Sequence, residues 1–387
     1  MRIPVKYNVR SLFARRGTTL MTVVSIALVV LVFVGVLALA GGLRASFAAS
    51  GEDRNVLVLR PGALSETQSF FDAGAKNRLL ALDGISRGSD GRPLASGEVL
   101  FIQVFRRPEG GESNVALRGV EPAGLLLRPR LQVVEGRAFE AGRNEVILGR
   151  KLAGRLPGMA LGGDLTLGKA RFRIVGVFEA AGGNAESEVW GATADLQSAF
   201  RRPAFSSVLV RADSAAAALQ LADRIDADTS LKLDGTVESR YWSDQTRYNE
   251  LRFVALGYAL AVMMAFGASF AAANTMYAQI ASRASEIGTL RALGFRRRNI
   301  LSAFLIEACV LGLFAGLVGA ALSIPLNAVT TGTLNSVTFS ETTFALRTTP
   351  DILLSGVFLA VFTALAGGLP AAWSAARRPI QELLRER

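Results

Sequence analysis

Residues Gly17 to Leu43 read GTTLMTVVSIALVVLVFVGVLALAGGL and carry no ionised side chain. At about 1.5 Å per residue, roughly 20 apolar residues in a helix cross a bilayer core of about 30 Å. This stretch is therefore long enough to span a membrane. Three more stretches lack ionised side chains and predict further spans: Phe253 to Ser282, Ala308 to Ser340 and Ile352 to Ala376.

The positive charge of the chain lies beside these four stretches. The segments before the first, between the second and third, and after the fourth hold 14 basic and three acidic residues, which accounts for the whole formal net charge of +11. Short cytoplasmic segments of membrane proteins are rich in Lys and Arg. This rule predicts cytoplasmic N- and C-termini and places the segment from Arg44 to Arg252 outside.

Composition excludes several kinds of site. The chain has no histidine, so imidazole acid–base chemistry and His-ligated metal sites are excluded. Cys309 is the single cysteine, so no intramolecular disulfide can form, and its apolar surroundings favour a packing role. The excess basic charge flanks the spans, which favours anionic lipid headgroups over nucleic acid as its partner.

The N-terminal residues allow two interpretations. Val9, Leu12 and Phe13 have helical spacing among arginines, which suits an interfacial helix, while a solvated basic leader fits equally well. Ala38-Leu39-Ala40 has the form of a signal-peptide cleavage site. The uncharged run is far longer than the about 7 to 15 residues of such a signal, so an uncleaved anchor is favoured.

The outer segment predicts an α+β domain. An apolar stripe from Ala218 to Ile225 indicates a helix behind a cap at Asp213 or Ser214. At the domain ends, 43–49 and 243–251 are expected to continue the neighbouring spans as a two-helix stalk. The predicted strands are Asn55 to Arg60, Glu98 to Phe105, Glu145 to Leu148 and Arg171 to Phe178.

Residues Gly163 to Ala170 read GDLTLGKA and match most of a phosphate-binding loop. Ala170 stands where that loop needs Ser or Thr to hold magnesium. The residues that follow alternate as a strand, whereas phosphate binding needs the N-terminus of a helix. A hairpin turn is therefore the better interpretation.

The segment between the second and third spans holds the most specific motif. Residues 285–294 read SEIGTLRALG, in which Ile287, Leu290 and Leu293 form an apolar stripe on a short helix. Gly294 stands where this helix would end. An apolar stripe exposed to the cytoplasm indicates a protein partner.

The third span carries small residues and one acid. Gly312 and Gly316 form a face that lets another helix approach closely, and Gly319 follows them. Such a face is typical of a dimer seam, although glycine is common in membrane helices for other reasons. Glu307 lies about 10 Å from the loop end, where it can reach toward the arginines at 296–298. A helix-anchoring role is favoured over ion or proton conduction.

In their shared order, these motifs resemble the membrane subunits of the MacB/FtsX-type ATP-binding cassette (ABC) transporters. That family has a Glu-Ile-Gly-x-Leu-Arg-Ala-Leu-Gly segment, which residues 286–294 match. The third span and the segment from Leu369 to Pro379 are similar to the family's later helices. The outer segment is similar to the family's periplasmic core domain at Glu135-Gly136-Arg137, Gly142, Glu145 to Gly149, Gly163-Asp164 and Val175 to Val177.

The resemblance implies a fold and its parts. The fold is an α+β membrane protein, with four transmembrane helices and one large mixed α/β extracytoplasmic domain between the first and second. The expected parts are an N-terminal helix (1–17), spans (18–43, 253–282, 300–326, 352–376), a MacB-like periplasmic core domain with stalk helices (44–252), a cytoplasmic coupling loop (283–299), a short periplasmic loop (327–351) and a cytoplasmic tail (377–387).

The resemblance also implies roles and partners. The expected protein is a non-catalytic permease subunit in a bacterial inner membrane, which passes ATP-driven motion to its periplasmic domain for export or extraction of a substrate. It would have no catalytic, cofactor or metal site of its own, because ATP and magnesium would bind a separate ATPase subunit. ATPase coupling is assigned to Glu286, Ile287, Gly288, Leu290, Arg291, Ala292, Leu293 and Gly294, and helix packing to Gly312, Gly316 and Gly319.

Further partners and two alternative functions stay open. A second permease copy is implied, as homodimer or heterodimer, and the family allows a periplasmic adaptor and an outer-membrane component. Lipoprotein, lipid, peptide and drug all remain open as substrates. One alternative is an FtsX-like regulator that activates a periplasmic cell-wall hydrolase, for which the outer segment is large. The other is an ATPase-independent sensor or channel, against which the cytoplasmic apolar stripe argues.

Overall fold

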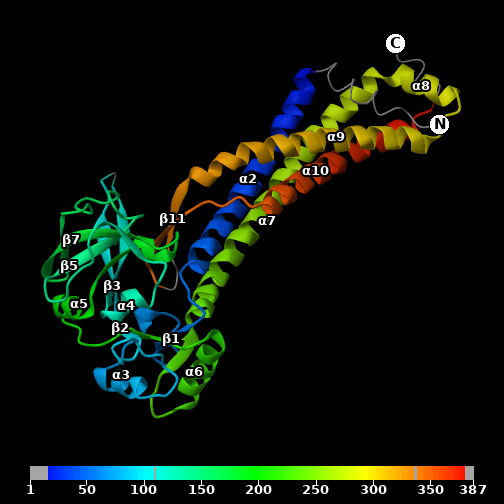
Figure 1. The fold of residues 1–387 in the computed structure, drawn as a ribbon. Coiled ribbons are helices and arrows are strands. Elements are labelled where there is room, and N and C mark those ends of the chain that lie inside the picture. Colours follow the sequence, from blue (N-terminus) through cyan, green and yellow to red (C-terminus); the bar gives the residue numbers. More distant parts are fainter. Residues whose placement is uncertain (1–15, 109, 335–337, 380–387) are drawn as a thin grey trace. The chain divides into compact units, whose positions relative to one another are not determined.

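The computed structural model describes residues 16–108, 110–334 and 338–379 (Figure 1). They form two compact units. The helical unit comprises Met1–Gly41, Leu251–Val329 and Leu346–Arg387, and the sheet unit comprises Gly42–Glu250 and Thr330–Ala345. The predicted N-terminal helix and most of the predicted tail lie outside the described residues.

The sheet unit is built on one mixed ten-stranded sheet, in the order β10-β1-β9-β2-β3-β8-β5-β7-β4, with β6 paired to β7. Neighbouring strands are antiparallel except in the pairs β3–β8 and β5–β7, which are parallel. The strands are β1 Asn55–Leu59, β2 Ala95–Arg106, β3 Glu112–Val120, β4 Gln132–Gly136, β5 Glu145–Gly149, β6 Asp164–Leu167, β7 Ala170–Glu179, β8 Glu188–Ala192, β9 Ser207–Arg211 and β10 Asp234–Val237.

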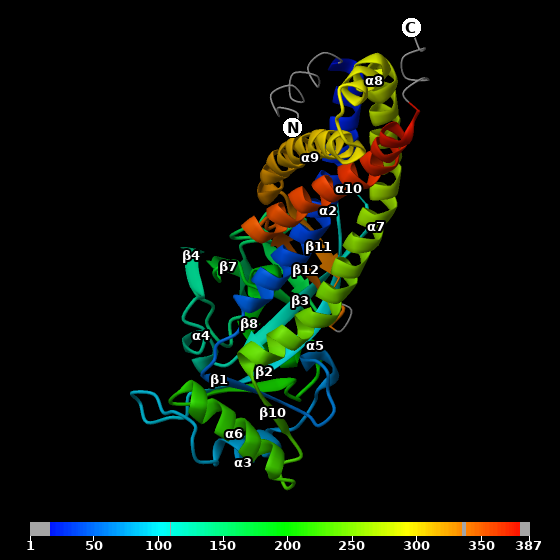
Figure 2. The same cartoon turned by 90° about the vertical axis from the view of Figure 1, so that its right-hand side faces the viewer.

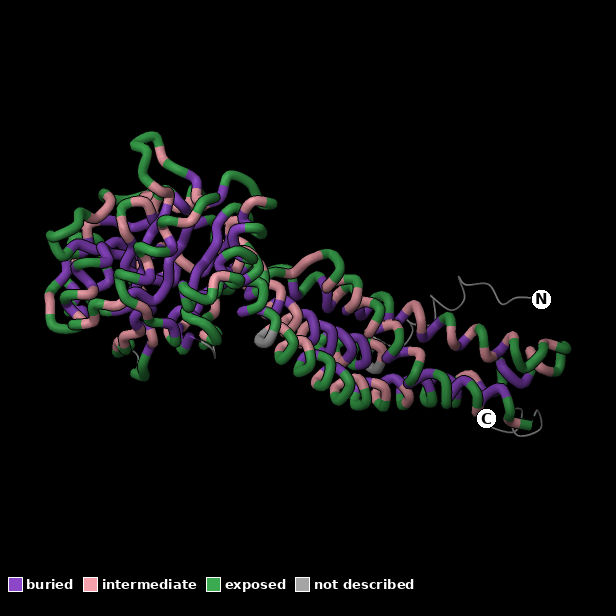
Figure 3. The backbone as a smooth tube through the Cα atoms, turned by 90° about the horizontal axis from the view of Figure 1, so that it is seen from below, coloured by how far each residue is buried: buried purple, intermediate pink, exposed green. Residues whose placement is uncertain are grey.

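Apolar residues of this sheet form two main clusters. One packs Val56 and Val58 of β1 against Leu221 and Ile225 of α6 (Ala215–Ala227), and the Ser214 hydroxyl caps that helix by accepting from the Ala217 amide. The other surrounds the buried Phe172 of β7. In the sheet unit, buried segments run through the interior and exposed segments lie at the periphery (Figure 3). The remaining elements are α3 Ala73–Leu80, α4 Ala123–Leu126, α5 Thr193–Phe200, η1 Glu66–Gln68 and η2 Asn184–Ser187.

The stretch that matches a phosphate-binding loop is a β-hairpin. Strands β6 and β7 are antiparallel, with Leu167 opposite Ala170. Gly168 and Lys169 make the turn, and Gly168 has φ +58°, a conformation that glycine adopts at little cost. The hairpin interpretation is confirmed.

A second hairpin lies in the segment expected to be a short loop. Strands β11 (Thr330–Leu334) and β12 (Glu341–Ala345) pair with each other and belong to the sheet unit. The Glu341 carboxylate accepts hydrogen bonds from Arg107 (2.6 Å), Ser113 (2.5 Å) and Arg155 (2.5 Å). This segment is therefore a folded part of the domain surface.

The helical unit contains most of the long helices. Among the described residues, four helices are long and apolar enough to cross a membrane. They are α2 Arg16–Ala48, α7 Glu238–Ser282, α9 Arg297–Ser323 and α10 Pro350–Arg377; α8 (Ala284–Ala292) and η3 (Ile324–Ala328) are shorter. Helix α2 continues past its apolar stretch and α7 begins before its own. In the sheet unit these extensions touch, with Arg44 3.5 Å from Glu250.

The glycines of α9 lie at helix contacts within the chain. A Cβ atom added to Gly312 would lie 2.8 Å from Ala364 Cβ, and one added to Gly316 would lie 2.9 Å from Ala360 Cβ. Helices α9 and α10 accordingly lie side by side (Figures 1 and 2). Gly319 faces α2 in the same way, with Ala27 O 2.7 Å from such a Cβ. Within the chain, α10 occupies the Gly312 and Gly316 face, so these glycines let α9 and α10 approach each other closely.

Candidate functional site: the coupling helix and a buried ion network

Helix α8 is a separate short helix between α7 and α9. Arg283 separates α7 from α8, because its backbone angles, φ −117° and ψ 16°, are not helical. At the other end, Gly294 takes φ +93°, the Phe295 amide donates to Leu290 O and the Gly294 amide donates to Arg291 O. These two bonds are those of a Schellman motif. Gly294 therefore ends the helix, as the sequence predicts.

The apolar stripe of α8 is not wholly exposed. Ile287 is buried within the helical unit, in a cluster with Ile280, Phe304 and Ala371. Leu290 is half-buried, whereas the Leu293 side chain is 72% exposed. The expectation of three apolar side chains facing a partner is corrected, because the helix rests on its own unit through Ile287.

Two other predicted coupling residues also face inward. The Arg291 guanidinium donates to Ala376 O (3.3 Å) and Arg378 O (2.8 Å), at the end of α10. Gly288 is buried. The exposed face of this segment carries Glu286, Ala292, Leu293 and Gly294 from the predicted set, with Ser285, Thr289 and Arg296 to Arg298 beside them.

The sheet unit contains a buried ion network that sequence reasoning missed. Arg118 on β3 donates to Glu66 Oε1 (2.7 Å), Glu98 Oε2 (2.9 Å) and Glu188 Oε2 (2.8 Å). Its side chain is only 3% exposed. Arg128 donates to the other oxygen of Glu98 at 2.6 Å. One arginine thus joins η1, β2, β3 and β8.

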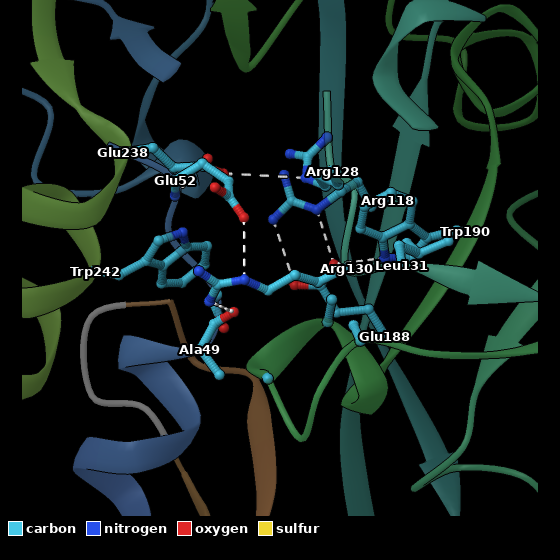
Figure 4. Close-up of a pocket in the computed structure, with 14 residues that line it drawn as sticks. Ala49, Glu52, Arg118, Arg128, Arg130, Leu131, Glu188, Trp190, Glu238 and Trp242 are labelled. Atoms are coloured by element: carbon cyan, nitrogen blue, oxygen red, sulfur yellow. Dashed lines mark hydrogen bonds and ion pairs between the residues drawn. The ribbon is translucent and has the colours of Figure 1, made fainter. Parts of the chain in front are cut away.

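The network extends to the first turn of α7. Glu238 Oε1 lies 4.0 Å from Arg128 Nε, and Glu238 Oε2 accepts from Asn55 Nδ2 (2.8 Å) and from the Glu52 amide (3.2 Å). Figure 4 shows Arg128 and Glu238 beside a cavity of about 40 Å³, which Ala49, Trp190 and Trp242 also line. The network therefore connects the sheet to the residues that follow α2 and to the start of α7.

The electrostatics of the network favour the charged forms of Arg118 and Glu66, whereas burial raises the pKa of Glu238. Burial alone would lower the pKa of Arg118, but the charges of Glu188 and Glu66 outweigh it and hold that pKa well above its ordinary value. Burial would likewise raise the pKa of Glu66, but the charge and hydrogen bonds of Arg118 outweigh it and lower that pKa. The sequence carries one signal of this network, since Glu98 directly precedes an apolar run, Val99 to Ile102, and Arg118 directly follows another, Val115 to Leu117.

Acidification is expected to destabilise the sheet unit through Glu66. Its pKa is lowered by folding, so its contribution to stability is present above the unfolded-state pKa of about 4.3 and is lost as pH falls through the folded-state value. Thermal unfolding of the full chain in detergent should therefore shift to lower temperature below about pH 4.5. Glu66→Gln should lower the unfolding temperature at neutral pH and weaken this acid dependence, while the exposed Glu135→Gln keeps the wild-type profile. Equal acid slopes in all three proteins would contradict the prediction.

Among the described residues, no group of three or more His, Cys, Asp or Glu is placed to hold a metal ion. Helix α8 has the exposed Leu293 at its C-terminal end, beside basic residues, and the ion network joins four elements of the sheet unit.

Comparison with known proteins assigns the family. Residues 19–228 match the MacB-like periplasmic core domain, and residues 258–380 match the FtsX-like permease C-terminal domain. A "Macrolide export ATP-binding/permease protein MacB" of Hyphomonas neptunium is 26% identical over 82% of this chain and 52% of its own length. A protein of that name from Bdellovibrio bacteriovorus is 24% identical over 97% of this chain and 60% of its own.

The chain thus spans little more than half the length of these curated relatives. The extracellular domain of the noncanonic ABC-type transporter YknZ from Gram-positive bacteria is 20% identical, with a TM-score of 0.34, and the match covers 47% of this chain and 99% of that one. The core-domain match alone covers more than half of the present sequence, and the permease match covers its C-terminal third. The chain therefore belongs to the MacB/FtsX-type family of ABC transporter permeases.

Proposed function

We propose that this chain is the non-catalytic permease subunit that transmits ATP-driven motion from a separate cytoplasmic ATPase to a periplasmic domain, for export or extraction of a periplasmic or membrane substrate. The observation that carries the proposal is α8. It is a short helix with defined ends, anchored to its own unit by Ile287, and it presents Leu293 beside exposed arginines. An ATPase subunit would contact α8 through Leu293, at the C-terminal end of the helix, and through the exposed basic side chains beside it.

Two uninterrupted helices support transmission toward the sheet unit. Helix α2 runs from Arg16 to Ala48 and α7 from Glu238 to Ser282, so both have residues in each of the two units. Arg283 follows α7 directly and leads into α8. An ATPase that moves α8 needs only to favour one of two arrangements of these helices.

The proposal includes a topology and partners. The proposal puts both termini and α8 in the cytoplasm and the sheet unit in the periplasm of a bacterial inner membrane, and the distribution of the basic residues supports this orientation. A second permease copy completes the transporter, with its contacts on surfaces other than the Gly312 face. ATP and magnesium bind the ATPase subunits.

Leu293→Asp is expected to uncouple the ATPase. The substitution puts a charge into an apolar contact, which should weaken ATPase binding about tenfold or more, because central apolar contacts dominate such interfaces. The measurement is the amount of ATPase that co-purifies with the tagged full chain from mild detergent, together with substrate export. Leu219→Asp is the matched control, because Leu219 is also exposed but lies on α6.

Three outcomes separate the functions. Loss of ATPase recovery with Leu293→Asp alone supports the proposal. Wild-type recovery and export in that variant would contradict it. A wild-type chain that recovers no ATP-binding subunit would instead favour an ATPase-independent sensor or channel.

A further inference from the structure

Polar side chains gather inside the helical unit where α2, α7 and α9 meet. Thr22 of α2 is 2% exposed, Gln279 of α7 is 6% exposed and Glu307 of α9 is 1% exposed. The hydroxyls of Thr22 and Thr275 lie 2.5 Å apart. Polar groups are costly inside a membrane protein unless they have partners. This cluster therefore calls for a physical reason.

One ion pair in the cluster involves the residue between α7 and α8. The Arg283 guanidinium lies 3.4 Å from Glu307 Oε2. Arg283 is the residue at which α7 ends and α8 begins. The buried carboxylate of α9 is thereby tied to the point about which α8 would move.

A small cavity lies beside this ion pair. It has a volume of about 10 Å³, and its polar lining comes from Thr22, Thr275, Gln279 and Glu307. Gln279 Oε1 is buried and has no hydrogen-bond partner among the described residues. A buried carbonyl oxygen that accepts no hydrogen bond destabilises a fold, so it favours an occupant that can donate.

The size and charge of the cavity select that occupant. About 10 to 15 Å³ is the space that one water needs, and buried waters fill polar cavities while apolar ones stay empty. A metal cation fits less well, because Arg283 already balances the Glu307 carboxylate. A second cation would leave a net positive charge in a medium of low dielectric constant.

We propose that one ordered water occupies this cavity, donates a hydrogen bond to Gln279 Oε1, and completes a polar latch that holds the α7–α8 hinge to α9 through Arg283 and Glu307. The latch links α7 and α9 at their ends nearest α8, so α8 cannot swing about Arg283 without straining or breaking it. The consequence for coupling rests on the proposed function, but the water site and the latch do not.

Radiolytic hydroxyl-radical labelling tests the water directly. Met276 lines the cavity and is 5% exposed. Methionine next to a bound water is oxidised by radicals formed from that water. In the full chain in lipid nanodiscs, Met276 should be oxidised at least about tenfold faster than Met159, a fully buried methionine in the apolar core of the sheet unit. Equal slow oxidation of both residues would show a dry cavity and overturn the proposal.

The same labelling separates water from a cation. Exchange of NaCl for KCl or choline chloride at constant ionic strength should leave the Met276 rate and the unfolding temperature unchanged. A sodium-specific rise in unfolding temperature with slower Met276 oxidation would identify a cation and overturn the water assignment.

Hydrogen exchange tests the latch. Glu307→Gln removes the charge that holds Arg283 and should speed exchange of the α8 amides about tenfold, whereas Ser302→Ala, on an exposed position of α9, should not. Arg283→Gln provides a second variant, which should give the same acceleration without altering α9. Unchanged α8 exchange in both latch variants would overturn the latch. These measurements use the chain without an ATPase, so they can succeed when the Leu293→Asp test fails, and the reverse also holds.

Discussion

Replacing Arg118 with methionine is expected to unfold the sheet unit at temperatures where the wild type is folded. The substitution removes the cation shared by Glu66, Glu98 and Glu188, whose side chains are no more than 4% exposed. Removing one partner of a buried ion pair costs about 3–5 kcal/mol, and here Glu66 and Glu188 lose Arg118 together while Glu98 keeps Arg128. Domains are stable by only about 5–15 kcal/mol, so the expected loss is a large part of the total.

Tryptophan fluorescence can follow this unfolding in the full chain. Two of the three tryptophans, Trp190 and Trp242, lie in the sheet unit and line the cavity beside Arg118. Arg130→Met is the matched control. The Arg130 side chain is 49% exposed and forms an ion pair with Glu52. The control should unfold close to the wild-type temperature. An Arg118→Met protein that unfolds there too would show that the network contributes little.

Gly312→Leu is expected to separate α9 from α10. A Cβ at this position would already lie 2.8 Å from Ala364 Cβ and 2.9 Å from Ala360 O, so a larger side chain has no room without a shift of one helix. Overpacking of a well-packed interior costs about 1–3 kcal/mol or more. The variant should therefore lose yield and unfold at a lower temperature in detergent.

Gly267→Leu is the matched control for this prediction. Gly267 lies in α7, and a Cβ there would meet no atom within 4 Å. The control should be produced and should unfold like the wild type. If both leucine variants behaved alike, helix propensity or lipid contact would explain the effect, and close packing of α9 on α10 would not.

Local patterns predicted several elements because the forces that form them are local. The uncharged stretches became long helices, and the alternating run at 171–178 became β7. The Ser214 hydroxyl caps α6, and Gly294 ends α8, because both residues satisfy backbone groups at helix ends. In each case the residue and the group that it satisfies are close in the sequence.

Other features depend on partners far away in the sequence. The β11–β12 segment was predicted to be a short loop, because the residues that hold it, Arg107, Ser113 and Arg155, lie far earlier in the chain. The inward orientation of Ile287 is set by α7, α9 and α10. Charges on β2 and β3 stand far apart in the chain, and only the sheet brings Glu98 and Arg118 together. Helical spacing predicts a stripe, but it does not say which neighbour covers it.

The β11–β12 hairpin changes what counts as one folding domain. A protein made only of residues 42–250 would lack Glu341, and Arg107, Arg155 and Ser113 would lose their shared acceptor. It would also lack Thr342, whose hydroxyl donates to Asn184 Oδ1 at 2.7 Å. The domain is therefore built from two separate segments of the sequence. A soluble fragment of residues 42–250 should therefore carry residues 330–345 on a linker. It would then keep the contacts that Glu341 and Thr342 make in the whole chain.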